Sequence, residues 1–429
     1  MVSCRLVIVA VLAWSSVQAS SLFSAHPLRE APLLSDMTAE VVPDSYMVIF
    51  KRDVDADALH THLTQLTTLL DMANLEAGFT DGDEDPNELA HVYRLPGLHG
   101  YAGRFQPDVL ARIRGATDVV DYVEHDSIVY ATDVQHRAPW GLARTSSRDT
   151  LSLRNFEKYV YDGKGGEGVT VYVVDTGVNI NHVDLKDRAR WGKTIPRNDE
   201  DEDGNGHGSH VAGTIAGTTY GVAKKAHIVA VKVLGSNGSG TMSDVVKGVE
   251  FTAIDHKSRN PNGTSIANMS LGGGPSRTLD MAVNAAVNHN VFFAVAAGNE
   301  NADACGSSPA SAEAALTVGA STIYDGRAYF SNFGKCVDVY APGLNIRSIW
   351  KGSKTATNTI SGTSMASPHV AGLAAYFLSL ADEPISPAEL KKMILDSSTQ
   401  NKLTGLTASC PNKLIYNNPP SDLTTGLLY

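Results

Sequence analysis

Three polar residues stand where apolar segments of the chain end or begin. Asp175 closes the apolar run VYVVD, His207 lies in the glycine-rich stretch GNGHGSHVAG, and Ser364 lies in SGTSMASPHVAG. A carboxylate, an imidazole and a hydroxyl are the groups that nucleophilic acyl transfer needs, because the imidazole removes the hydroxyl proton and the carboxylate orients the imidazole. Each residue alone is more often a turn, cap or packing residue, so the hypothesis rests on the three together.

Ser364 and Pro368 lie among small residues where a helix is expected to begin. Small residues let a helix pack closely on a sheet, which is a structural explanation without chemistry. A helix N-terminus also offers unpaired backbone N–H groups and a positive dipole end to a developing oxyanion. We expect Pro368 in the first helical turn, where proline is tolerated. Asn299, after Gly298 in AVAAGNE, could donate its amide to the same oxyanion, although a plain turn asparagine is the commoner fate.

Apolar runs from about residue 140 onward predict the elements that would hold these residues. The runs GVTVYVVDTG, AHIVAVKVL, SIANMSLGGG and VFFAVAAGN alternate with helix-like stretches. Near-continuous apolar runs are typical of parallel strands that are buried on both faces. The ends of such strands are where open α/β sheets gather functional groups. The sequence therefore predicts an α/β domain with a doubly wound, mainly parallel sheet over residues 138–429.

Residues 43–131 show a different order of elements. SYMVIFK, ELAHVYRL, LHGYAGRF and VVDYVEHDSIVYA are strand-like, leucines from Leu59 to Leu70 recur at helical spacing, and Pro107 opens a second helix. The order β-α-β-β-α-β predicts a small α+β domain of the ferredoxin-like kind. Its place between a leader and a large domain suggests a propeptide.

The N-terminus has the pattern of a secretory leader. Arg5 precedes a short apolar run and Ala19 ends a cleavage-site pattern, so we predict a signal peptide at residues 1–19. The run is shorter than the roughly 20 apolar residues of a membrane anchor. A net charge of −11 argues against nucleic acid or an anionic membrane as a partner. We expect a monomer that is secreted, with the lumen of a vacuole as the alternative.

The cysteines fit an oxidising compartment. Cys4 would leave with the signal peptide, and Cys305, Cys336 and Cys410 would remain. One disulfide and one free thiol is the simplest arrangement of three cysteines. Cys305 and Cys336 flank a single strand–turn–strand stretch, so we expect these two to pair.

Five short motifs carry a resemblance to a known family. In chain order, VVDTG, GHGSHVAGT, SLGGG, AAGN and GTSMASPHVAG resemble the signature blocks of the subtilases, the subtilisin-like serine proteases. The longer stretches DTGVNINHVDL, GTMSDVVKGVE and GKCVDVYAPGLNI resemble the proteinase K branch, above all its fungal vacuolar members. The likeness covers residues 138–418, and residues 43–131 resemble a subtilase inhibitor propeptide. One departure is Ser209, where the family usually has threonine.

The resemblance implies a serine endopeptidase that is made as a self-processing zymogen and acts on proteins and peptides. Asp175, His207 and Ser364 would be its triad, and Asn299 its oxyanion donor. The substrate-binding residues implied are Ser270, Leu271 and Gly272 on one wall of the specificity pocket and Ala296, Ala297 and Gly298 opposite. Residues 236–240 would form an edge strand that pairs with substrate and includes Gly238, Ser239 and Gly240. Small residues in the pocket would suit large apolar or aromatic side chains, within a broad specificity.

No cofactor is implied for the chemistry, but the resemblance implies a structural calcium site. Its ligands would be the side chain of Asp338 and the main-chain carbonyls of Glu313 and Ala315. Three Asn-x-Ser/Thr sequons also occur, of which Asn268 falls in a predicted buried strand and Asn237 in the substrate cleft. Asn262, in the polar loop RNPNGT, is therefore the expected glycan acceptor.

Other functions fit the sequence less well. The acidic stretch DEDEDGNGHGSH begins like a calcium-binding EF-hand loop, but its twelfth position is His210 instead of glutamate. His207 and His210 could bind zinc, yet no H-E-x-x-H pattern is present. A catalytically dead subtilase fold would be expected to lose one of its four key polar residues, and all four are kept. A dinucleotide-binding oxidoreductase would need a glycine fingerprint that the first strand lacks.

Overall fold

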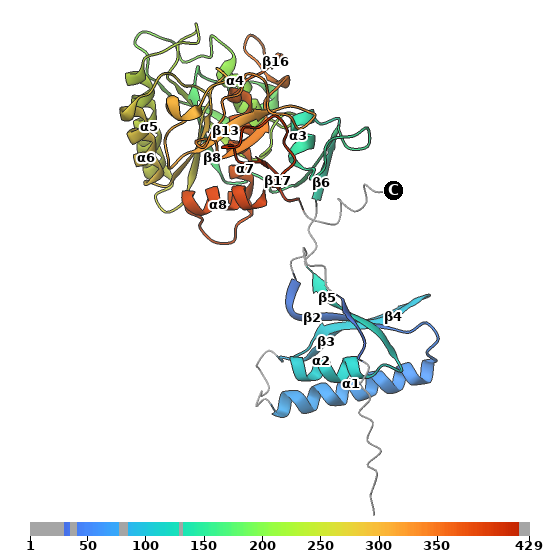
Figure 1. Cartoon of the computed structure of the whole chain (residues 1–429). Coiled ribbons are helices and arrows are strands. Elements are labelled where there is room, and N and C mark those ends of the chain that lie inside the picture. The colour runs from blue at the N-terminus through green and yellow to red at the C-terminus, as the bar shows by residue number, and fades with distance from the viewer. Residues whose placement is uncertain (1–29, 35–40, 77–84, 128–131, 420–429) are drawn as a thin grey trace, which may run out of the picture. The chain divides into compact units, whose positions relative to one another are not determined.

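The computed structural model describes residues 30–34, 41–76, 85–127 and 132–419. The predicted signal peptide lies outside these residues. The chain divides into two compact units, Met1–Ile128 and Val129–Tyr429 (Figure 1). Within the described ranges no helix has the length and apolar character that crossing a membrane requires.

The first unit contains one sheet and two helices. Its elements are β1 (Leu33–Leu34), β2 (Val41–Phe50), α1 (Ala56–Glu76), β3 (Glu88–Leu95), β4 (Leu98–Arg104), α2 (Pro107–Gly115) and β5 (Val120–Ser127). The strand order is β1-β5-β2-β4-β3, with antiparallel neighbours except for the short β1, which runs parallel to β5. The predicted β-α-β-β-α-β order is therefore confirmed.

Alternation along β2 explains how this sheet buries one face. Tyr46, Val48 and Phe50 lie in a cluster with residues of both helices, including Leu66 and Leu70. Side chains alternate between the two faces of a strand, so the intervening residues of β2 lie on the other face. Both helices cover the same face of the sheet (Figure 1).

The second unit is built on a nine-stranded sheet with the order β17-β18-β14-β13-β12-β11-β8-β10-β9. Its strands are β8 (Thr170–Asp175), β9 (Ala189–Thr194), β10 (His227–Lys232), β11 (Ser265–Met269), β12 (Val291–Ala296), β13 (Leu316–Ser321), β14 (Val339–Pro342), β17 (Thr399–Gln400) and β18 (Lys413–Leu414). All neighbours are parallel except β17 and β18. The predicted doubly wound, mainly parallel α/β sheet is confirmed.

Helices and two small ribbons surround the large sheet. The helices are α3 (Trp140–Thr145), α4 (His207–Ala216), α5 (Met242–Arg259), α6 (Arg277–Val287), α7 (Thr363–Leu380) and α8 (Pro387–Ser397). The ribbons pair β6 (Thr132–His136) with β7 (Lys158–Asp162) and β15 (Ile346–Ile349) with β16 (Thr357–Ile360). Both ribbons are antiparallel.

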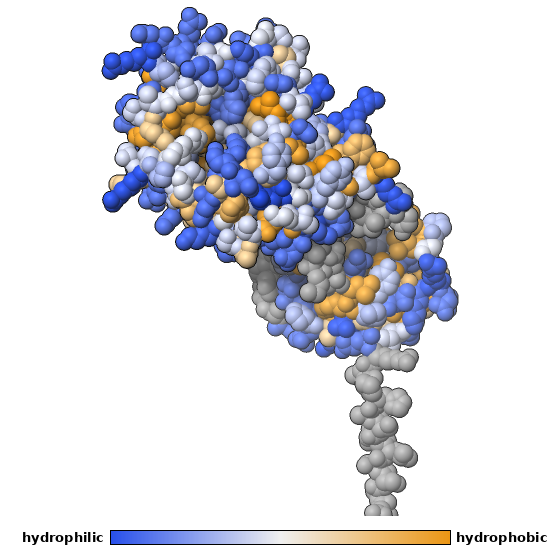
Figure 2. Space-filling view, turned by 45° about the horizontal axis from the view of Figure 1, so that its top comes forward, coloured by the Kyte–Doolittle hydropathy of each residue, from blue (hydrophilic) through white to orange (hydrophobic). Residues whose placement is uncertain are grey.

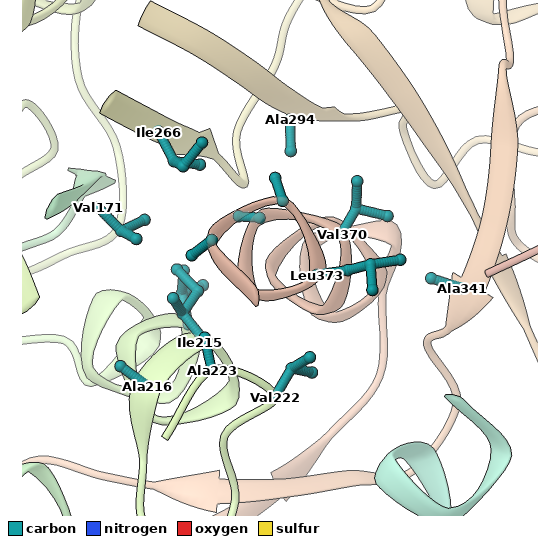
Figure 3. Packing of buried hydrophobic residues seen from close by; sticks show 14 of the residues in the cluster. Val171, Ile215, Ala216, Val222, Ala223, Ile266, Ala294, Ala341, Val370 and Leu373 are labelled. Atoms are coloured by element: carbon teal, nitrogen blue, oxygen red, sulfur yellow. The ribbon is translucent and has the colours of Figure 1, made fainter. Parts of the chain in front are cut away.

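The central strands are apolar throughout because both faces of the sheet are covered. Val171 and Val173 of β8 lie in one cluster with residues of α4 and α7, whereas Tyr172 and Val174 lie in another with residues of α5 and α6. Helix α7 runs through the middle of the first cluster, with Val370 and Leu373 among side chains of α4 and several strands (Figure 3).

The small residues of α7 have a packing role. A Cβ atom on Gly372 would lie 2.8 Å from Cβ of Val222 and 3.1 Å from the carbonyl oxygen of Ile215. Real Cβ atoms do not approach other atoms so closely without displacement, so only glycine lets α7 approach α4 in this way. The structural explanation for the small residues is therefore correct for this part of the helix.

The other side of the sheet carries an apolar groove between α5 and α6. Its volume is ≈ 530 Å³, and its apolar lining is Val246, Val249, Ala253, Ile254, Ala282, Ala285 and Ala286. Figure 2 shows an apolar area on the side of the unit that carries these helices in Figure 1. The groove shares no lining residue with the two cavities described below.

Candidate active site

The carboxyl ends of the central strands bring the predicted residues together. Asp175 is the last residue of β8, Asn299 follows β12, and the first turns of α4 and α7 contain His207 and Ser364. Gly206 precedes α4 with a φ of +104°, and a Cβ there would lie 2.5 Å from the Trp350 ring. Glycine is therefore required at the position that sets where the His207 helix begins.

Asp175 and His207 form a close pair. Nδ1 of His207 lies 2.7 Å from Oδ1 of Asp175, which also accepts the N–H of Thr176 at 2.8 Å. Asp175 is fully buried, whereas the His207 side chain is 24% exposed. Burial lowers the pKa of His207, but the carboxylates of Asp175 and Asp203 raise it by more, so this pKa lies above its ordinary value. An imidazole that donates from Nδ1 keeps Nε2 as the proton acceptor.

Ser364 makes reciprocal hydrogen bonds with Ser270. The Ser364 hydroxyl donates to the Ser270 carbonyl at 3.1 Å, and the Ser270 hydroxyl donates to the Ser364 carbonyl at 2.7 Å. Pro368 explains the second bond, because it has no N–H to donate to the carbonyl four residues earlier, which belongs to Ser364. Helix α7 begins at Thr363, so Pro368 lies in its interior. The expectation of a proline in the first turn was wrong. The proline leaves the Ser364 carbonyl without a hydrogen-bond donor from its own helix.

A series of hydrogen bonds between buried polar side chains holds the Ser270 hydroxyl. The Ser367 hydroxyl donates to Oδ1 of Asn268 at 2.8 Å, and Nδ2 of Asn268 donates to the Ser270 hydroxyl at 2.8 Å. Both Asn268 and Ser367 are fully buried. Sequence reasoning missed this series, although a polar residue inside the apolar run SIANMS was a usable signal. These hydrogen bonds fix the Ser270 hydroxyl, which in turn donates to the Ser364 carbonyl.

Asn299 is oriented by the residue before Ser364. Its Oδ1 accepts hydrogen bonds from the backbone N–H of Thr363 at 2.8 Å and from the Thr363 hydroxyl at 3.0 Å. Its Nδ2 group is thereby directed away from these donors. Gly298 has a φ of +103°, and a Cβ there would lie 2.3 Å from Nδ2 of Asn332, so glycine is required before Asn299. Asn299 and Ser364 line the same cavity.

Two neighbouring cavities form a cleft around these residues. One, of ≈ 470 Å³, is lined by Ser364 and Asn299, and the other, of ≈ 440 Å³, by His207. They share the lining residues Leu271, Gly272 and Gly273. Of the predicted pocket residues, Leu271, Gly272, Ala296 and Gly298 line the first cavity, and Ser270, Leu271, Gly272, Gly238, Ser239 and Gly240 line the second.

Two details of the predicted pocket are corrected. Ala297 is fully buried in a satellite cluster with Ala304 and Tyr340, and it does not line either cavity. Residues 236–240 form a turn instead of an edge strand, because Gly238 has a φ of +80° and its N–H donates to the carbonyl of Gly235 at 2.8 Å. Among the described residues, the segment 236–240 is not paired with any strand.

Asp203 is a residue that sequence reasoning treated only as part of a failed calcium loop. It is 8% exposed, and its carboxylate accepts five hydrogen bonds at the start of α4. The donors are the Thr176 hydroxyl, the backbone N–H groups of Asn205, Gly206 and Ser209, and the Ser209 hydroxyl. Asp203 thus joins the end of β8 to the helix that carries His207, and Ser209 supplies one of the hydroxyl donors.

The expected calcium ligands converge on a lysine. Nζ of Lys391 donates to the carbonyls of Glu313 at 3.3 Å and Ala315 at 2.6 Å, and to Oδ2 of Asp338 at 3.0 Å. An ammonium group thus takes the position that a cation would need, and the arrangement does not fit calcium. The expectation of calcium at this site is corrected accordingly. No cluster of three or more His, Cys, Asp or Glu suited to a metal occurs among the described residues.

The other residue predictions concern covalent features. Cys305 and Cys336 form a disulfide and Cys410 is free, as predicted. Asn268 is buried and Asn237 lies on the exposed rim of the cleft. Asn262 is exposed in the turn after α5, so it stays the predicted glycan acceptor.

A carboxylate–imidazole pair and a serine in neighbouring cavities at the carboxyl edge of a parallel sheet fit a serine peptidase. The chain belongs to the subtilase family: the model described as "Subtilase family" matches residues 166–411, and "Peptidase inhibitor I9" matches residues 45–132. The predicted family and propeptide are thus confirmed. Catalysis in this family needs no cofactor.

Fungal proteases and a solved structure show the same likeness. A subtilisin-like protease of Coccidioides posadasii and Pen ch 18 of Penicillium rubens are each 53% identical over 93% of this chain and 85% of their own length. Alkaline protease 2 of Aspergillus fumigatus is 51% identical, with 93% and 86% covered. The crystal structure of a cold adapted subtilisin-like serine proteinase is 47% identical, with a TM-score of 0.60, over 66% of this chain and 98% of its own.

Proposed function

We propose that Asp175, His207 and Ser364 are the catalytic triad of a secretory-pathway serine endopeptidase, and that Asn299 donates to its oxyanion. The observation that supports this most is that His207, paired with the buried Asp175 at 2.7 Å, lines a cavity next to the one that Ser364 and Asn299 line. Incubation of the mature enzyme with a fluorophosphonate probe should label Ser364, which peptide mapping would identify. Absence of labelling in a folded protein would contradict the proposal.

The reaction follows from the groups present. The Ser364 hydroxyl turns from the Ser270 carbonyl to Nε2 of His207, transfers its proton there, and its oxygen attacks the substrate carbonyl carbon. Asn299 Nδ2 and the backbone N–H of Ser364 bind the oxyanion. The His207 proton passes to the amine leaving group as the C–N bond breaks. Water then repeats the sequence on the acyl-enzyme and frees Ser364.

A change at Pro368 tests how Ser364 is held. In Pro368→Ala a new N–H can donate to the Ser364 carbonyl and compete with the Ser270 hydroxyl, so the nucleophile should shift. We expect kcat to fall about tenfold or more, since small displacements of reacting groups are costly. The thermal midpoint should not fall, because proline in a helix interior is itself unfavourable. Steady-state kinetics and a melting curve check both; an unchanged kcat would contradict the assigned role.

Asp203 should position His207 and raise its pKa. In Asp203→Asn the negative charge near His207 is lost, so the acidic limb of kcat/KM should move to lower pH. The free energy of unfolding should fall by about 2–4 kcal/mol, because hydrogen bonds to a buried charge are lost. Asp201→Asn is the matched control, since Asp201 is exposed and accepts a hydrogen bond from Thr194. A purely structural role would lower stability and leave the pH limb in place.

We propose a broad specificity that favours large apolar or aromatic side chains before the cleaved bond. The ≈ 470 Å³ cavity has room for such a side chain beside Leu271, Ala296 and glycine backbone. Glu300 also lines this cavity, and its Oε2 accepts a hydrogen bond from Nδ2 of Asn332 at 2.8 Å. A lysine side chain could lie along the apolar walls with its ammonium near this carboxylate.

Glu300→Gln should therefore separate two substrates. For peptides that differ only before the cleaved bond, kcat/KM should fall about 3- to 10-fold with lysine and less than about twofold with leucine, since an exposed ion pair is worth roughly 1 kcal/mol. Glu383→Gln, at an exposed site in the loop before α8, is the control. Equal losses for both peptides would show that Glu300 acts on the cavity shape and not through its charge.

We also propose that the enzyme is made as a self-processing zymogen, inhibited by its own propeptide and exported as a monomer. The inhibitor-family match supports the propeptide role. Strand β6 pairs with β7 of the peptidase unit from Thr132 to His136, which favours cleavage on the N-terminal side of Thr132. The N-terminal sequence of the purified mature enzyme tests this. A start within β6 would contradict it.

A further inference from the structure

We propose that the ammonium group of Lys391 is the permanent cation of the oxygen cage formed by the Glu313 and Ala315 carbonyls and the Asp338 carboxylate. The chain would thereby stabilise this corner of the sheet without calcium. The inference does not depend on the roles assigned to the triad.

The hydrogen bonds of Lys391 match its chemistry. A lysine ammonium has three donors and no acceptor. Three acceptors surround it, at 3.3 Å, 2.6 Å and 3.0 Å, so every donor has a partner. Oδ2 of Asp338 also accepts the backbone N–H of Thr317 at 2.8 Å, which fixes the carboxylate. The side chains of Lys391 and Asp338 are 21% and 25% exposed, so water screens the pair only in part.

Helix α8 holds Lys391 in place. Leu390 and Ile394 of this helix are fully buried in the core, and Ser386 and Glu389 form a capping box at its start. Lys391 then bridges three parts of the unit: α8, the segment before β13, and Asp338 directly before β14. The link thus joins elements that lie far apart in the sequence.

Calcium and this ammonium exclude each other. Calcium takes six to eight oxygens at about 2.3–2.6 Å, and the lysine nitrogen stands where these three oxygens converge. A bound ion also stabilises a fold only in proportion to the logarithm of its concentration, whereas an intramolecular cation is always present. The stability that this site provides should therefore be independent of calcium.

Thermal unfolding of the mature enzyme, inactivated with a fluorophosphonate, tests the proposal. We compare wild type, Lys391→Met and Lys392→Met in a chelator and in about 10 mM calcium. Lys392 is the matched control, because it pairs with Asp396 on the exposed side of the same helix. Lys391→Met should melt about 3–8 °C lower than wild type in chelator and recover in calcium, since the vacated cage can take the ion. Lys392→Met should stay within about 2 °C of wild type.

A third variant, Asp338→Asn, tests whether calcium binds at this site in the wild type. It can be measured even if Lys391→Met is not processed to the mature enzyme. Any calcium response at other sites should be equal in wild type and Asp338→Asn, which would support the proposal. A calcium response of wild type that Asp338→Asn removes would show that calcium displaces the lysine, and would overturn it. So would a Lys391→Met variant that melts like wild type in chelator, or one that is destabilised and does not recover in calcium.

Discussion

Ser364→Ala is expected to abolish peptide hydrolysis and to leave a full-length precursor that lacks only its signal peptide. The oxygen that would become acylated is removed, while Asn299 and the cleft remain. The loss in kcat should be about 10⁶-fold, the scale that loss of this nucleophile produces in subtilisin itself. Self-processing should stop for the same reason, and wild type should release a fragment that ends near residue 131. Immunoblotting in a host without other proteases, together with peptide hydrolysis, measures both effects.

The control for this variant is Ser361→Ala. Ser361 is exposed three residues before the nucleophile and interacts with Asn345. It should be processed and active like wild type. The released fragment, made separately, should inhibit the mature enzyme. Normal processing of Ser364→Ala would mean that another protease removes the propeptide, even if hydrolysis by the variant is lost.

Asp175→Asn is expected to lower the plateau rate about 10⁴-fold, the scale known for the equivalent acid in subtilisin and trypsin. An amide can no longer hold the imidazole with Nδ1 as donor, and it provides no charge to stabilise the imidazolium. The variant should also shift the pH profile. In the proposed mechanism the neutral form of His207 is the active one, so activity should be lost as pH falls through its pKa, and removal of the carboxylate should lower that pKa.

The self-processing rate of purified precursor, followed on gels from about pH 5 to 10, measures both changes without requiring mature variant enzyme. Wild type should lose activity at a pH above the ordinary histidine value, and Asp175→Asn at a lower one. Circular dichroism of both precursors controls for folding. If the acidic limb of the pH profile does not move in Asp175→Asn, His207 is not the titrating group, whatever the change in the plateau rate.

The sequence predicted the sheet and its functional edge because both follow from local patterns. Continuous apolar runs identify strands that are buried on both faces, and the polar residues that follow them gather at one edge of a parallel sheet. Asp175 and Asn299 were found in this way. The small N-terminal domain was equally predictable, since alternating strands, leucine spacing and Pro107 define its order.

What the sequence did not predict depends on contacts between distant segments. Pro368 leaves the Ser364 carbonyl without a partner inside the helix, but the Ser270 hydroxyl that donates to it lies 94 residues earlier, directly after β11. Lys391 reaches a carboxylate 53 residues away, and nothing in the local pattern around α8 indicates it. The turn at Gly238 was missed because an edge strand was inferred from resemblance and not from backbone conformation.

The pairing of β6 with β7 has a consequence for the lifetime of the mature enzyme. If processing occurs before Thr132, the new N-terminus is the first residue of a strand that is hydrogen-bonded along its length from Thr132 to His136. Free chain ends are where exopeptidases begin and where fraying starts. An end that is paired in a ribbon resists both, so the mature enzyme would keep the N-terminus that processing creates.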